Sequence, residues 1–134
     1  MAAALLAIVT AASWTAWLSS NHVFALRASE ARHRAAADLA SETTPEAAVI
    51  LALQHTGNVR YYAHRQTVNW DRIPPGQFDV SVAALVRDGH PVYLMLDSQA
   101  EREMFEAKHG TVVDREGWLP NGQRGNVQLF AAPR

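Results

Sequence analysis

The sequence predicts an α/β fold: a small three-layer, Rossmann-like domain with a mostly parallel sheet, preceded by a transmembrane helix and a linking helix. Two continuous apolar runs, residues 48–53 and 91–96, are too short for helices and indicate strands buried on both faces. Segments with helical spacing alternate with the strands, as in right-handed parallel crossovers. We therefore expect a membrane segment at 1–26, a linking helix at 27–44 and an α/β domain at 45–134.

Residues 1–26 contain no charged side chain. A bilayer core requires roughly 20 helical residues, and Trp14 and Trp17 suit the lipid–water interface. The alternatives are a signal peptide, which the missing basic start disfavours, and an alanine-rich core helix. We expect a transmembrane helix or signal anchor here. The arginines that follow it would place the domain of a lone helix in the cytoplasm.

The helices are predicted from spacing and from end signals. Residues 29–41 favour a helix that ends before Pro45 and packs on one side of the sheet. Apolar side chains recur at helical spacing over 78–86. Ser98 and Glu101 have the spacing of a capping box, which opens a helix that runs to residue 109.

The remaining segments are short strands and turns. A polar turn at 54–58 leads into a short helical segment through Tyr62 and then a strand at 67–70. Towards the C-terminus we expect strands at 111–113 and 127–131, separated by a loop over 114–125 that is rich in Pro and Gly. The last strand is predicted to lie at a sheet edge and to be antiparallel.

Composition and motifs exclude several function classes. The chain has 12 basic and 13 acidic residues, so it lacks the excess of Lys and Arg that marks nucleic-acid binding. It has no cysteine and therefore no disulfide or thiolate metal site. Phosphate-binding and dinucleotide glycine loops are missing, and His55 and His64 lack a third metal ligand at a fixed spacing. We expect no cofactor, no metal and no catalytic residue.

Polar residues follow the predicted carboxyl ends of the strands, where open α/β sheets bind ligands. A glycine before a helical turn could also offer backbone N–H groups to a phosphate. The alternative is that these residues cap the helix, satisfy backbone groups and pack. The candidate ligand-binding residues are Gln54, His55, Thr56, Gly57, Asn58, Arg60, Tyr61, Arg65, Asp71 and Asp97.

The sequence from Gln54 to Tyr62, followed by Arg65 and residues 68–71, resembles a known family. It is similar to the C-terminal extracytoplasmic domain of bacterial polytopic GT-C type membrane glycosyltransferases, such as dolichyl- or polyprenyl-phosphate-mannose mannosyltransferases. The specific motif covers residues 54–71, and the order of the elements extends the resemblance over most of the chain.

The resemblance implies a function for the chain. Family members transfer a sugar from a lipid-phosphate donor with an acidic residue from an early loop, so this chain would be a non-catalytic C-terminal accessory domain, a fragment of such an enzyme. Its partners would be the lipid bilayer and a polyprenyl-phosphate sugar donor or acceptor, held by His55, Arg60, Tyr61 and Arg65. The domain would be extracytoplasmic at the bacterial inner membrane. The alternatives are a freestanding membrane-anchored α/β ligand-binding or interaction domain, and a soluble α/β enzyme released by signal cleavage.

Overall fold

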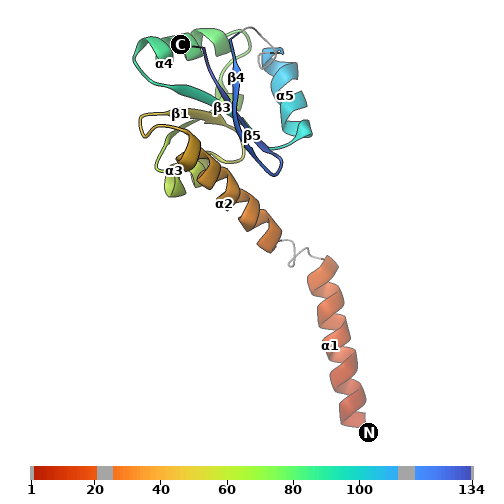
Figure 1. Ribbon diagram of the computed structural model, residues 1–134. Coiled ribbons are helices and arrows are strands. Elements are labelled where there is room, and N and C mark those ends of the chain that lie inside the picture. Colours follow the sequence, from red (N-terminus) through yellow and green to blue (C-terminus); the bar gives the residue numbers. More distant parts are fainter. Residues whose placement is uncertain (1, 21–25, 112–116, 134) are drawn as a thin grey trace. The chain divides into compact units, whose positions relative to one another are not determined.

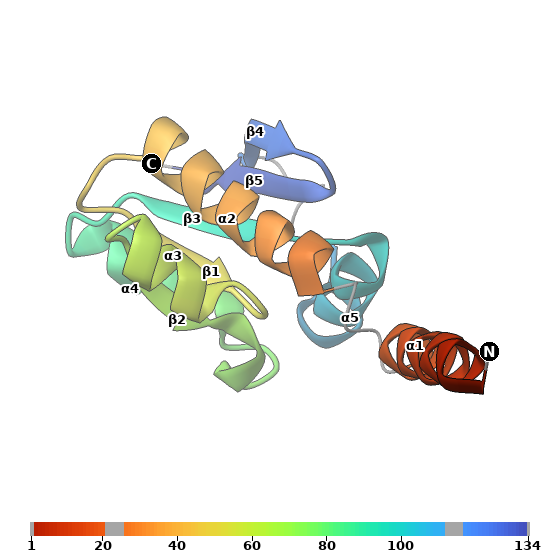
Figure 2. The same ribbon diagram turned by 90° about the horizontal axis from the view of Figure 1, so that it is seen from below.

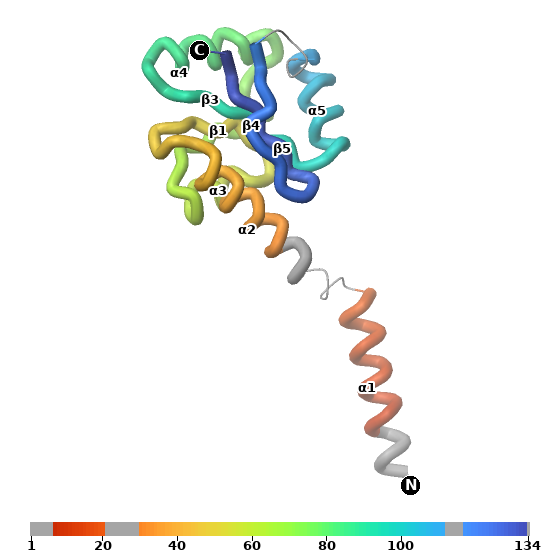
Figure 3. Tube along the Cα trace, in the orientation of Figure 1, coloured from red at the N-terminus to blue at the C-terminus, as the bar shows by residue number. Residues whose placement is uncertain are grey.

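The computed structural model describes the backbone of residues 2–20, 26–111 and 117–133. Figure 3 follows the Cα trace from red at the N-terminus to blue at the C-terminus. The chain forms two compact units, Met1–Arg32 and His33–Arg134. The first unit contains helix α1 (Ala2–Ser20) and the beginning of helix α2 (Leu26–Thr43). The second half of the linking helix is therefore part of the α/β unit.

Helix α1 is present where an apolar helix was predicted. Small side chains (Ala, Ser and Thr) separate its few large apolar ones. Within the described ranges, no helix is both long enough and apolar enough to cross a bilayer. This finding contradicts the transmembrane helix predicted for residues 1–26.

The α/β unit contains a five-stranded sheet in the order β2-β1-β3-β5-β4 (Figure 1). Its strands are β1 (Val49–Ala52), β2 (Gln66–Asn69), β3 (Val92–Leu96), β4 (Leu119–Arg124) and β5 (Val127–Ala131). Strand β1 pairs in parallel with β2 and β3, whereas β5 pairs antiparallel with β3 and β4. The small α/β domain is confirmed, but the sheet is mixed, and the prediction of a mostly parallel sheet is wrong.

The antiparallel half of the sheet arises from a hairpin. Strand β4 lies within the predicted loop 114–125, and a tight turn at Gly125, which has a φ of +59°, connects it to β5. So short a connection can join only antiparallel strands. The strand predicted at 111–113 falls at the end of the described residues: Thr111 is a bend, and the other two positions lie outside them.

Helices cover both faces of the sheet. Helices α2 and α3 (Thr56–Tyr62) pack on one face, where Leu39, Val59 and Met95 share a buried core (Figure 2). Helices α4 (Phe78–Arg87) and α5 (Gln99–His109) pack on the other, with Phe78, Phe105 and Leu94 in a second core. Every residue of β1 and β3 is buried, which confirms the strands predicted to be covered on both faces.

The ends of α5 follow the predicted signals. The Ser98 side chain accepts a hydrogen bond from the Glu101 amide at 3.2 Å, and Gly110 ends the helix with a φ of 80°. The Glu101 carboxylate reaches one residue further back than a standard capping box, to the amide of Asp97 at 3.1 Å. Trp70, predicted as the end of a strand, instead begins a short 3₁₀ helix, η2 (Trp70–Arg72).

Candidate functional site

The carboxyl ends of β1 and β3 form the point at which the chain connections diverge. The chain leaves β1 for α3 on one face of the sheet and leaves β3 for α5 on the other. In open α/β sheets a ligand crevice is expected between two such strands. Here that position holds His55, which follows β1, and Asp97, which follows β3.

His55 and Asp97 form a buried pair. His55 Nε2 lies 3.0 Å from Asp97 Oδ2, and each residue is 1% exposed. An ionised carboxylate only accepts hydrogen bonds, so the proton of this bond resides on His55 Nε2. His55 Nδ1 then faces Nδ1 of His33, on α2, at 3.3 Å. The predicted crevice is therefore closed by a hydrogen-bonded histidine and aspartate.

A second carboxylate, Glu101, lies beside this pair and is 2% exposed. It accepts hydrogen bonds from the Asp97 amide at 3.1 Å and from the Trp70 indole at 3.4 Å, and the Leu53 backbone also bonds to it. These three partners follow β3, β2 and β1 respectively. Burial raises the pKa of Glu101, and the hydrogen bond from the Asp97 amide partly offsets that effect.

His109 lies at the end of α5 among aromatic rings. Its ring centroid is 5.0 Å from that of Phe78 and 5.2 Å from that of Phe105, and its Nε2–H donates to the Trp70 carbonyl at 3.2 Å. Burial lowers the pKa of His109 because the charged imidazolium would lose its hydration. His109 is therefore a neutral core residue at pH 7.

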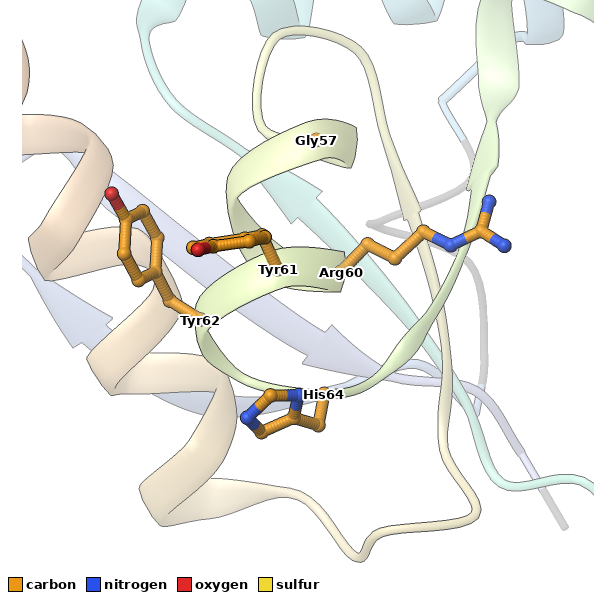
Figure 4. A pocket seen from close by; sticks show the side chains of 5 residues that line it. All are labelled: Gly57, Arg60, Tyr61, Tyr62 and His64. Carbon is orange, nitrogen blue, oxygen red and sulfur yellow. The ribbon is translucent and has the colours of Figure 1, made fainter.

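The open part of this region is a shallow depression of about 710 Å³ around α3, which we call the α3 surface. Figure 4 shows Tyr61 and Tyr62 directed towards α2 and Arg60 directed away from them. Tyr61 is 73% exposed and Tyr62 is 45% exposed, and their rings meet edge to face at 4.9 Å. The residues that line the α3 surface are Gly57, Arg60, Tyr61, Tyr62 and His64.

Two features fix side chains of the α3 surface. The Arg34 guanidinium of α2 lies over the Tyr62 ring, 4.9 Å from its centroid, a cation–π contact that holds the ring in place. His64 has a φ of 53°, in the left-handed region that non-glycine residues rarely adopt. Such strained residues cluster at functional sites. The α3 surface is thus partly organised by a contact with α2 and by the backbone at His64.

The structure divides the ten predicted site residues into groups and does not bring them into one pocket. Gly57, Arg60 and Tyr61 line the α3 surface, whereas His55 and Asp97 are buried together. Glu101 and His33 were not among the predicted residues: Glu101 has the position of an ordinary helix cap, and no local signal relates His33 to a turn 22 residues later.

Arg65 and Asp71 connect elements of the fold. Arg65 donates from Nη2 to the carbonyl of Thr44 at 2.9 Å and from Nη1 to that of Ala63 at 2.7 Å, so it holds the end of α2. The Asp71 carboxylate accepts from Lys108 of α5 at 3.0 Å. These contacts are structural in kind.

The other three predicted residues belong to the turn and the start of α3. The Thr56 carbonyl accepts a hydrogen bond from the Thr67 hydroxyl at 3.2 Å, which joins α3 to β2. Gln54 is exposed and Asn58 is partly exposed.

Among the residues that the structure describes, no group of three or more His, Asp or Glu side chains is arranged to hold a metal ion. No protein-family model, curated protein or solved structure significantly matches the chain. The fold and the site define an α/β domain with a closed polar edge, formed by His55 and Asp97, and an open surface that carries tyrosine and arginine side chains.

Proposed function

We propose that the α/β unit is a non-catalytic accessory domain of a membrane glycosyltransferase that takes sugar from a lipid-phosphate donor. Under this proposal the domain works on the extracytoplasmic side of the bacterial inner membrane and helps to hold a polyprenyl-phosphate sugar donor or acceptor. The two parallel crossovers on opposite faces of β1 support a Rossmann-like interpretation of the sheet.

The α3 surface is the observation that carries the proposal. It lies within the segment that resembles the glycosyltransferase domains, and it exposes side chains suited to a phosphorylated sugar. A guanidinium such as that of Arg60 can form two parallel hydrogen bonds to a phosphate. The exposed ring of Tyr61 offers a flat apolar face and a hydroxyl, which suits a ligand that is partly apolar and partly polar.

A binding role fits the buried network better than a chemical one. Three groups with acid–base chemistry at the strand ends, His55, Asp97 and Glu101, are each at most 2% exposed and hydrogen-bonded within the protein. A general acid or base must come within hydrogen-bond reach of its substrate. In this arrangement the network positions the loop that carries α3.

The test is a titration of the isotopically labelled chain, followed by NMR, with mannose 1-phosphate as the probe. We expect a dissociation constant near 1 mM, as for a weak head-group contact, with shifts confined to residues 57–64. Arg60→Ala and Tyr61→Ala should each weaken binding, whereas Arg87→Ala, an exposed arginine on α4, should not. Free mannose and inorganic phosphate, titrated separately, show which half of the probe is recognised.

A second candidate is a freestanding ligand-binding or interaction domain. It is favoured by the kind of side chain exposed at the α3 surface, because Tyr and Arg are enriched where proteins bind one another. If none of the three probes shifts residues 57–64 although both variants remain folded, the glycosyltransferase proposal is wrong and the interaction domain becomes the better interpretation.

A further inference from the structure

The contact between His33 and His55 links α2 to the turn that follows β1. Their Nδ1 atoms are 3.3 Å apart, and their ring planes are inclined by 71°. On the other side of the His55 ring, Nε2 donates a hydrogen bond to Asp97 Oδ2 at 3.0 Å. Three elements are thus joined in a row: α2, the β1–α3 turn and the β3–α5 turn.

The order of hydrogen bonds in this row determines where the protons lie. Since Asp97 accepts from His55 Nε2–H, a neutral His55 has a lone pair on Nδ1, which accepts from His33 Nδ1–H. If His55 takes up a proton at Nδ1, a neutral His33 can reverse its role and accept. When both imidazoles are protonated, two N–H groups and two positive charges face each other across 3.3 Å, and the contact cannot persist.

His33 is also the position at which α2 begins to dock. Residues 30–32 are exposed and His33 is half-buried, while Ala36, Ala37, Leu39 and Ala40 are buried in the core. The end of the helix is held independently by Arg65 and by Asn121, whose side chain donates to the Thr43 carbonyl at 3.0 Å. Loss of the histidine contact therefore frees one turn and leaves the rest of the helix in place.

Other ionisable groups modify the protonation of the two rings. On the side of His55 they are Asp97 and Glu101, the latter bonded to the Asp97 amide. On α2, Glu30, Arg32 and Arg34 flank His33 in the sequence, and Arg34 is directed to the Tyr62 ring. On α3, Arg60 belongs to the exposed α3 surface. The Asp97 carboxylate stabilises the first imidazolium to form, on His55. Protonation of the second imidazole is unfavourable because two N–H groups would then face each other.

We propose that His33 and His55 form a pH switch: the first docked turn of α2 stays in place while at most one of the two imidazoles is protonated and is released when both are. This inference does not depend on the proposed ligand or on the glycosyltransferase resemblance. It gives the first docked turn of α2 an attachment that responds to acid.

The test is amide hydrogen exchange of the whole chain at pH 7.5 and pH 5.5, corrected for the intrinsic rate. We expect the protection of amides 33–37 to fall about tenfold at pH 5.5, while amides of β1 and β3 keep theirs. In His33→Asn, the side-chain nitrogen is as many bonds from the backbone as Nδ1 and can still donate to His55, but it does not titrate. This variant should retain protection at both pH values.

His90→Gln, which changes a partly exposed histidine between α4 and β3, should behave like the wild type. Equal protection of the wild type at both pH values, or a loss of protection that persists in His33→Asn, would overturn the proposal. Should His33→Asn fail to fold, ¹⁵N shifts of the wild-type imidazoles decide the question. Release of amides 33–37 should accompany protonation of the second ring and not of the first. Protonation of both rings with these amides still protected also contradicts the switch.

Discussion

Glu101 shows how a buried carboxylate can be retained in a small domain. Its oxygens accept hydrogen bonds from residues that follow β1, β2 and β3. Burial of a charged carboxylate is unfavourable unless hydrogen bonds replace the lost water, and here three donors do so. The same geometry makes the ends of three strands depend on one side chain of α5.

The raised pKa of Glu101 gives a defined pH dependence. The pKa of Glu101 in the folded state lies above its ordinary value of 4.5. At pH values above 4.5 the folded state therefore binds this proton more readily than the unfolded state does. The stabilisation is therefore complete below pH 4.5 and is lost as the pH rises through the folded pKa. Relative to Glu101→Gln, which does not titrate, the wild type should lose stability from pH 4.5 to pH 8, measured by urea unfolding.

Glu103 offers the control for that experiment, since it is exposed on the same helix. Glu103→Gln should leave the pH dependence of the wild type unchanged. If the stability of the wild type relative to Glu101→Gln stays constant or increases as the pH rises, the assigned role is wrong.

Arg65 is the second side chain whose loss should be costly. Its guanidinium holds carbonyls at the end of α2 and after α3. Lysine keeps the charge but lacks the planar fork, so Arg65→Lys should destabilise the unit by about 1–3 kcal/mol in chemical unfolding. Arg87→Lys, at an exposed arginine on α4, should change stability little. Equal stability of the two variants would show that this set of hydrogen bonds contributes nothing.

Among the elements, the two central strands and α5 could be predicted from the sequence, and β4 could not. Continuous apolar runs identified β1 and β3, and Ser98 and Gly110 marked both ends of α5. Strand β4 contains Pro120 and Gly122, which normally indicate a loop. It is a strand because β5 pairs with it, a tertiary effect that no local pattern contains.

Gly122 adapts β4 to the helix above it. A Cβ at this position would lie 3.0 Å from Leu39 Cδ1 and 3.4 Å from Thr43 Cγ2, so α2 leaves no room for a side chain. Gly122→Val should destabilise the unit by about 1–3 kcal/mol through overpacking. Gly57→Ala is the matched comparison: Gly57 lies in α3, and a Cβ added there would have no atom within 4 Å.

In a helix, alanine is favoured over glycine, so Gly57→Ala should stabilise the unit by about 0.5–1 kcal/mol. Thermal unfolding of both variants gives the comparison. If Gly122→Val melts at or above the wild-type temperature, α2 does not pack on β4 as described.

At the scale of the whole molecule, the sequence predicted which polar residues follow the strand ends, but it did not predict how deeply each of them is buried. The rule that ligands bind at strand ends pointed to His55 and Asp97, which the fold does bring together. The places of His55 and Asp97 in the sequence do not show that their side chains are buried, because the burial depends on packing with α2 and with Glu101. The exposed residues Arg60 and Tyr61, by contrast, remain in keeping with a binding role that awaits its test.

The α/β unit should fold without the first unit. The core residues that the structure describes lie at or after Ala36. A chain that begins at Glu30 retains His33 and should unfold within about 4 °C of the complete chain, because it keeps every one of these described core residues. Circular dichroism during heating provides the measurement. A truncated chain that is unfolded at room temperature would show that residues 1–29 stabilise the sheet.

The late position of the β4–β5 hairpin in the chain also affects how the protein emerges during synthesis. Until Val127 and its neighbours leave the ribosome, β3 has an unpaired side and the small residues of α2 lack their cover. Unpaired strand edges promote association between nascent chains. Polypeptides arrested just before Leu119 should therefore be the most aggregation-prone intermediates of translation and the ones most in need of a chaperone.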